Sequence, residues 1–329
     1  MRKYLCACAL ALAFFLGTHG CCADRFALCL TGQLPRLELG TKVENVLVTN
    51  LAAGHDVALF VRLSNESKTS GGKGLDTHLY TSFSENFLQE FISRHVYSGL
   101  LNKGKNETAG VFHVSVMYDT STHPSYFEPF NDTIPTSRLN GETDAVKRFT
   151  LNFIMLTQIR ACMRFVSSYE VQTRAFYDYV VRLRDDSYVF APWVFKPALY
   201  IGGVSDIKPG SWGGLNDHTL VVDRLYADVM LRGPAEDYYL NNTETGMRFK
   251  STEGLLMRVA RSMAVPIHIL SVCNLPLVTL RGLTPDKDAW VLHKVYAHKY
   301  LDEVMQQHEE CSARSLSNPT IPLHPIDAQ

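Results

Sequence analysis

The amino-acid sequence predicts an α/β fold, in which one domain holds a mostly parallel sheet flanked by helices. In the amino-terminal half, apolar runs of strand length alternate with longer runs whose apolar residues recur at helical spacing. The composition is that of a globular protein, with 46% hydrophobic and 20% charged residues in a chain of 329. A formal net charge of −1, without a long basic run, argues against a dedicated nucleic-acid-binding protein.

The amino-terminal elements follow in a regular order. Residues 25–36 are expected to form a buried strand with a turn at Thr31–Gln33, and residues 39–53 a helix that Thr41 caps. The elements expected next are strand 55–63, helix 84–96, strand 110–119, helix 148–171 and strand 177–184. Ligands of such sheets bind at the carboxyl ends of the strands, so we expect the site there.

The carboxyl-terminal half is less regular. A glycine-rich loop that includes Gly210 leads into a strand and a helix. A further helix is expected to begin at Ser251 or Thr252, and a late strand or pair of strands lies within 267–281. The Ser-, Pro- and Asn-containing stretch 309–329 is expected to be a loose tail.

Residues 1–23 are predicted to be a secretory signal peptide. A basic start, an apolar run and small residues before Ala23 form the usual pattern. The apolar run is shorter than the roughly 20 residues of a spanning helix, and a signal anchor is the alternative. The sequons of Asn65, Asn106, Asn131 and Asn241 all lie in polar, loop-like stretches that could carry a glycan, and glycans are predicted on at least two of Asn65, Asn106 and Asn131. The expected location is the lumen of the secretory pathway (ER or Golgi) or outside the cell, with type II membrane anchorage as the alternative.

Four cysteines, Cys29, Cys162, Cys273 and Cys311, remain after the leader. An even number can pair in an oxidising compartment, in any of three ways. Cys29 in an apolar strand and Cys162 on the apolar side of a helix also suit buried free thiols. Without a C-x-x-C spacing, structural zinc is not expected.

Strand 177–184 ends in arginines and adjacent carboxylates: Arg182, Arg184, Asp185 and Asp186. A divalent cation on a diphosphate needs only one or two carboxylates, because phosphate and water complete its shell, and guanidinium groups match phosphate oxygens. Alternation places the arginines on one face of the strand and leaves Asp186 past its end. The simpler alternative is a surface Arg–Asp pair. In a partly exposed, repulsive pair, the loss of one carboxylate is expected to cost little stability.

Three other stretches carry candidate site residues. In 211–218, Trp212 offers an aromatic platform, and Asn216, Asp217 and His218 offer polar groups, although a simple turn explains them equally well. Glu253 at a helix start is either a partner of the helix dipole or a base.

The loop after the first strand carries Gly32, Gln33 and Arg36, which could touch a base or a phosphate. The loop lacks G-x-G-x-x-G and G-x-x-x-x-G-K-[ST], so neither a classical dinucleotide site nor a P-loop is indicated.

The order of these pieces resembles a group of GT-A-like glycosyltransferases, which includes bacterial lipopolysaccharide-core synthesis proteins and relatives in plants, algae and protists. Its most specific element is the pattern Tyr-Asp-x-Val-x-Arg-x-Arg-x-Asp, from Tyr177 to Asp186. The resemblance implies a GT-A-like (Rossmann-like) domain over 24–308, with Asp186 as the first metal ligand and Asp185 as the second. The chain departs from a strict Asp-x-Asp, because Asp185-Asp186-Ser187 stands in its place.

The activity that the resemblance implies is transfer of a sugar from a nucleotide-sugar donor to a hydroxyl of a glycan or glycoconjugate. Mn²⁺ or Mg²⁺ would act as Lewis acid on the leaving diphosphate, and Asp217 or Glu253 would be the base or acceptor contact. The residues expected to bind the nucleotide sugar are Gly32, Gln33, Arg36, Arg182, Arg184, Trp212 and Asn216. A non-catalytic carbohydrate-binding relative and a metal-dependent phosphotransferase or hydrolase are open alternatives.

Overall fold

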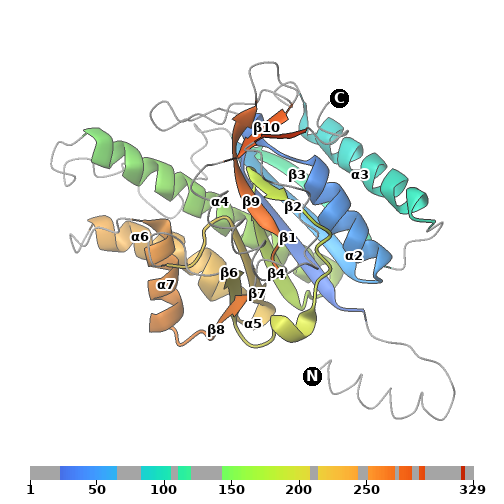
Figure 1. Cartoon of the computed structure of the whole chain (residues 1–329). Coiled ribbons are helices and arrows are strands. Elements are labelled where there is room, and N and C mark those ends of the chain that lie inside the picture. Colours follow the sequence, from blue (N-terminus) through green and yellow to red (C-terminus); the bar gives the residue numbers. More distant parts are fainter. Residues whose placement is uncertain are drawn as a thin grey trace, which may run out of the picture.

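A central sheet runs through the part of the chain that the computed structural model describes, namely residues 23–64, 83–104, 110–119, 143–207, 214–243, 251–270, 274–283, 289–292 and 320–322. Its seven strands have the order β3-β2-β1-β4-β7-β6-β8 (Figure 1). Their bounds are β1 (Arg25–Gln33), β2 (Asp56–Ser64), β3 (Phe112–Asp119), β4 (Tyr179–Arg184), β6 (Val204–Ile207), β7 (Thr219–Asp223) and β8 (Ile267–Leu270).

Most neighbouring strands of this sheet are parallel. β1 pairs in parallel with β2 and β4, β2 with β3, and β6 with β8. Only β7, within the described chain, runs antiparallel to its neighbours β4 and β6. Helices cover both faces of the sheet (Figure 1). The structure therefore confirms the predicted class, an α/β, Rossmann-like domain with a mostly parallel sheet flanked by helices.

Two apolar cores lie on opposite faces of the central sheet. Alternate side chains of β1 point to different cores, so that Leu28 belongs to the first and Cys29 to the second. Helical segments of the first core are η2 (Lys42–Val48), α2 (Thr49–Ala52) and α3 (Glu85–Asn102). Those of the second are α4 (Thr143–Thr173), α5 (Arg224–Ala227), η6 (Asp228–Arg232), α6 (Gly233–Thr243) and α7 (Thr252–Ser262). None of the helices among the described residues is long and apolar enough to cross a membrane.

A second, antiparallel sheet lies beside the carboxyl end of β4. Its order is β11-β10-β9-β5, with β5 (Ser187–Val189), β9 (Leu277–Leu283), β10 (Ala289–Leu292) and β11 (Thr320–Pro322). Because β5 begins directly after Asp186, the acidic pair forms the turn from one sheet to the other. Leu280 of β9 donates its backbone N–H to the carbonyl of Asp186 at 2.9 Å, which ties this turn to the second sheet.

Two local predictions near the strand ends were wrong. Thr31–Gln33 do not form a turn but the last part of β1, because their pairing with Arg62–Ser64 of β2 continues to the end. The chain turns only after β1, in the 3-10 helix η1 (Leu34–Arg36). Another 3-10 helix, η5 (Pro197–Leu199), follows β5. Thr41 does not cap a helix: its own backbone is helical, and its hydroxyl donates to Glu38 Oε2 at 2.8 Å.

Other predictions have mixed outcomes. Ser251 caps α7 as predicted, since its hydroxyl accepts the N–H of Gly254 at 3.1 Å, and 267–281 holds two strands. Asn241 lies in helix α6 rather than in a loop. The predictions that fall outside the described residues concern residues 1–22, Gly210, Trp212, Cys273, Cys311, the sequons at Asn65, Asn106 and Asn131, and all of the tail 309–329 except β11 (Thr320–Pro322).

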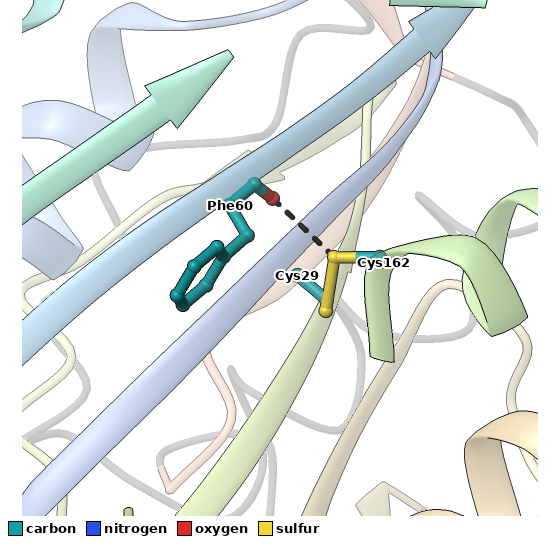
Figure 2. Close-up of a disulfide and its surroundings, with 3 residues drawn as sticks. All are labelled: Cys29, Phe60 and Cys162. Atoms are coloured by element: carbon teal, nitrogen blue, oxygen red, sulfur yellow. Dashed lines mark hydrogen bonds between the residues drawn. A yellow bond between two sulfur atoms is a disulfide. The ribbon is translucent and has the colours of Figure 1, made fainter. Parts of the chain in front are cut away.

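Cys29 and Cys162 form a disulfide between β1 and α4, with their Cα atoms 5.9 Å apart (Figure 2). The interpretation of both as buried free thiols was therefore wrong. Parallel strand order places Cys29 under α4 although 133 residues separate the two cysteines. Cys162 Sγ lies 3.5 Å from the Phe60 carbonyl oxygen, a contact that becomes a hydrogen bond only in the reduced thiol, because a disulfide sulfur carries no hydrogen.

Reduction of this disulfide is expected to lower the free energy of unfolding by about 5 kcal/mol, because the bond closes a long loop in the unfolded chain. Urea unfolding with and without dithiothreitol measures the change. The double variant Cys29→Ala/Cys162→Ala serves as the control, and its unfolding midpoint is expected not to respond to dithiothreitol. Equal midpoints of the wild type in both conditions would contradict this role of the bond.

Candidate functional site

The carboxyl ends of β1 and β4 meet the amino end of β7 at one edge of the central sheet. After β1, the chain adds β2 and β3 on one side of β1, and it then returns to place β4 on the other side. The sheet therefore has a topological switch point between β1 and β4. Because β7 is antiparallel to β4, Asp217 and His218, which precede β7, lie beside Asp185 and Asp186, which follow β4. The topology thus gathers residues from three separate stretches.

Asp185 fixes the loop after β1 to the end of β4. Its Oδ2 accepts hydrogen bonds from the Gln33 N–H and from Arg36 Nε, both at 2.8 Å, and its Oδ1 accepts one from Arg36 Nη2 at 2.9 Å. The side chain is fully buried. Gly32 has φ +143°, and a Cβ there would lie 2.2 Å from Asp185 Cγ. Only glycine therefore allows the two strand ends to approach this closely.

Asp186 forms a close ion pair with Arg184. Arg184 Nη2 donates to Asp186 Oδ2 at 2.8 Å, and Arg184 Nε lies 2.8 Å from Asp186 Oδ1, which accepts no hydrogen bond within the described chain. Arg184 Nη1 is 3.0 Å from His218 Nε2 and 3.5 Å from Asp217 Oδ2. Since a guanidinium only donates, His218 Nε2 is the acceptor, and its protonated Nδ1 donates to Thr279 Oγ1 at 3.0 Å.

Burial and opposite charges set the protonation of this cluster. Burial by itself would raise the pKa of Asp186, but Arg184 and Arg36 hold that pKa below its usual range. Burial and the adjacent Asp186 raise the pKa of Asp185, although Arg36 opposes the shift. Both carboxylates are buried, so the expectation of a partly exposed pair whose loss costs little was wrong.

Arg182 lies two residues before Arg184 in β4, so both side chains point to the same face of the sheet. Its side chain is 1% exposed, and its Nε, Nη1 and Nη2 have no hydrogen-bond partner within the described chain. Burial lowers the pKa of Arg182 to about 10, against the opposing effect of Asp217. A buried guanidinium without partners is costly, and an anionic group nearby would compensate it.

Glu253 joins the site from the first turn of α7. The Leu215 N–H donates to the Glu253 carbonyl at 3.1 Å, and a Cβ on Gly214 would lie 2.1 Å from the carbonyl atoms of Glu253. Burial and the charge of Asp217 raise the pKa of the Glu253 carboxyl. A carboxyl with a raised pKa at a site is a candidate proton acceptor or donor.

Asn216 stabilises the turn that carries Asp217 and His218. Its Oδ1 accepts the backbone N–H of His218 at 2.9 Å, and its own N–H donates to Asp206 Oδ2 at 2.5 Å. The side-chain oxygen predicted to bind a nucleotide sugar is thus engaged in local structure, as the turn alternative implied.

The acidic pair, as arranged, does not fit a preformed Mn²⁺ or Mg²⁺ site. Each carboxylate already has both oxygens in contact with an arginine, and a cation would have to displace those contacts. Among the described residues, no group of three or more His, Cys, Asp or Glu side chains is arranged to hold a metal. Metal dependence stays a prediction.

The structure brings most of the predicted site residues to this edge of the sheet. They are Gly32, Gln33, Arg36, Arg182, Arg184, Asp185, Asp186, Asn216 and Asp217, with Glu253 close enough to Asp217 for their charges to interact. The sequence did not reveal three further residues of this region. Glu38 and Lys42 contact the backbone carbonyl of Asp185, and Thr279 contacts the His218 ring. No motif marks these three, because their contacts arise only where the start of η2 and strand β9 pack beside β5.

Stability is expected to fall between pH 6.5 and pH 4 through His218. Burial and Arg184 lower the pKa of His218 to about 4, below its ordinary value of 6.5. The contribution of His218 to the free energy of unfolding is therefore complete above pH 6.5. It is lost as the pH falls from 6.5 to 4, because in this range His218 binds a proton in the unfolded chain but not in the folded protein. The loss amounts to about 3 kcal/mol. Urea unfolding at pH 7 and pH 4.5 measures it, and His218→Gln is expected to flatten the dependence. An unchanged slope in His218→Gln would refute the assignment.

Comparisons with known proteins show only a weak likeness of structure. No protein-family model matches the chain, and no curated protein sequence matches it. Among solved structures, the chain is similar to the glycosyltransferase GlyE of Streptococcus pneumoniae TIGR4, with a TM-score of 0.34 and 10% sequence identity. The match covers 76% of this chain and 46% of that protein, so the chain spans less than half of GlyE. At this level the likeness does not bear on the chemistry of the site.

Proposed function

We propose that this protein is a glycosyltransferase of the secretory pathway, which moves a sugar from a nucleotide-sugar donor to a hydroxyl of a glycan or glycoconjugate. The observation that carries the proposal is the buried charged cluster at the switch point between β1 and β4. This is where α/β sheets of this type bind nucleotides. The Cys29–Cys162 disulfide supports an oxidising compartment.

The nucleotide side of the proposed site is the loop after β1. Gly32 keeps the backbone free of a side chain at the strand end, and Arg36 is held there by Asp185 with its side chain 18% exposed. The diphosphate would lie toward Arg184 and Arg182. Arg184 is fixed by Asp186, whereas Arg182 supplies a buried positive charge that no described side chain neutralises by a hydrogen bond.

The acceptor side of the proposed site is the amino end of β7 and α7. Asp217 and Glu253 interact electrostatically, and the negative charge of Asp217 helps to raise the pKa of Glu253. Of the two, Glu253 is the better proposed base, because a raised pKa brings a carboxylate closer to neutral working conditions. Asp217 is engaged with Arg184 and stays charged, since its pKa is lowered.

A panel of nucleotide sugars tests the proposal. The protein is incubated with each donor, with Mn²⁺ or with EDTA, and released nucleoside diphosphate is measured with and without simple glycan acceptors. Hydrolysis of one donor, faster with an acceptor, is the expected result. A folded protein that binds glycans but releases no nucleotide would favour the non-catalytic alternative. Release of inorganic phosphate would favour the phosphotransferase or hydrolase alternative.

A further inference from the structure

Lys42 is buried against the turn that carries Asp186. Its side chain is 4% exposed. Its Nζ donates to the backbone carbonyl of Asp185 at 3.1 Å and to that of Ser187, so it contacts the main chain on both sides of Asp186. The same Nζ donates to the Glu38 carbonyl at 2.5 Å and lies 3.1 Å from Glu38 Oε2. One ammonium group thus joins the start of η2 to the turn between the two sheets.

Glu38 and Thr41 add further hydrogen bonds between the start of η2 and the turn between the two sheets. Glu38 is fully buried, and Thr41 donates to it twice, through its N–H at 2.7 Å and its hydroxyl at 2.8 Å. The same hydroxyl accepts the N–H of Val189 in β5 at 3.0 Å, and the Glu38 N–H donates to the Asp185 carbonyl at 2.9 Å. The buried charges are therefore paired and hydrogen-bonded, which is the condition under which a buried ion pair persists.

We propose that Lys42 is a positioning residue, which holds the turn so that the Asp186 carboxylate faces Arg184. This inference rests on the proposed function for the role of Asp186. Residues in a turn leave carbonyls that neither sheet satisfies, and a lysine ammonium has three donors that can converge on them. Without Lys42, the carbonyls of Asp185 and Ser187 lose a donor and the Glu38 charge is unpaired. The turn then relaxes and Asp186 loses its fixed orientation.

A double-mutant cycle tests the coupling between Lys42 and Asp186. Lys42→Met, Asp186→Asn and the double variant are compared by kcat/KM for the donor that the wild type hydrolyses. Lys42→Met is expected to lower kcat/KM about tenfold, as positioning contacts do. On the Asp186→Asn background it is expected to add little, because the carboxylate that it positions is gone. Effects that multiply in the double variant would overturn the inference.

Amide hydrogen exchange tests the same inference without activity. Lys42→Met is expected to speed exchange in peptides that cover 183–190. The matched control is Arg224→Met, which breaks a partly buried ion pair with Glu170 near the opposite end of β4 and is expected to leave exchange in 183–190 unchanged.

If Lys42→Met does not fold, Lys42→Arg is used in both assays, because it keeps a charge opposite Glu38 while its planar group cannot reach all the carbonyls. Unchanged exchange in 183–190 overturns the inference whatever the activity. If exchange is faster in Lys42→Met but the wild type turns over no nucleotide sugar, the proposed function is rejected. The conclusion that Lys42 orders the turn is then still supported.

Discussion

Asp186→Asn is expected to lower nucleotide-sugar turnover about 100-fold, because a small displacement of a catalytic group is enough for such a loss. The Asp186 oxygens hold Arg184 through two contacts of 2.8 Å, and the amide keeps the shape of the side chain but loses its charge. A hard cation, if one binds, also selects the charged form. Because the carboxylate is buried, unfolding free energy is expected to fall by about 3 kcal/mol as well.

Steady-state turnover at a temperature well below the melting transition separates the two effects, with a thermal melt of each variant beside it. Asp228→Asn is the matched control, because Asp228 also pairs with arginines, Arg224 and Arg232, but is 43% exposed and lies beyond the carboxyl end of β7, whose amino end carries the candidate site. Its turnover is expected to equal that of the wild type. Wild-type turnover in folded Asp186→Asn, with or without Mn²⁺, would remove Asp186 from the site.

Gly32→Ala is expected to destabilise the protein by more than about 4 kcal/mol, the range of the most disruptive single substitutions. A new Cβ would lie 2.2 Å from Asp185 Cγ and Oδ1, and the backbone φ of +143° is unfavourable for any side chain. Asp185 cannot move away, because Gln33 and Arg36 bind both of its oxygens. Chemical unfolding, or the yield of folded protein, measures the loss.

Gly202→Ala isolates the backbone part of this cost. Gly202 also has a positive φ, +78°, but a Cβ there meets nothing within 4 Å. Its substitution is expected to cost only about 1 kcal/mol. Equal losses at the two glycines would mean that the contact between β1 and Asp185 contributes nothing, and that the two strand ends are less closely packed than described.

The sequence by itself determined the fold class, and it predicted the end of the sheet at which the candidate site residues gather. Apolar periodicity identified β1, β2, β3, α4 and β4, since a strand or helix needs only its own residues to show its spacing. The Arg184-Asp185-Asp186 stretch marked the candidate site because adjacent carboxylates repel each other, so that folding alone gives little reason to place them together. The rule that ligands bind at strand ends then linked this stretch to Gly32 and Gln33.

Only the tertiary structure decided what each of these residues contacts. Asp185 and Asp186 look equivalent in the sequence, yet one binds Arg36 and the other binds Arg184. Cys29 pairs with Cys162 rather than staying a thiol, and Lys42, which no pattern marks, reaches both sides of the Asp186 turn. The physical reason is that strand periodicity is local, whereas partners 143 or 149 positions apart, such as Lys42 and Arg36 with Asp185, are set by the order in which strands pack.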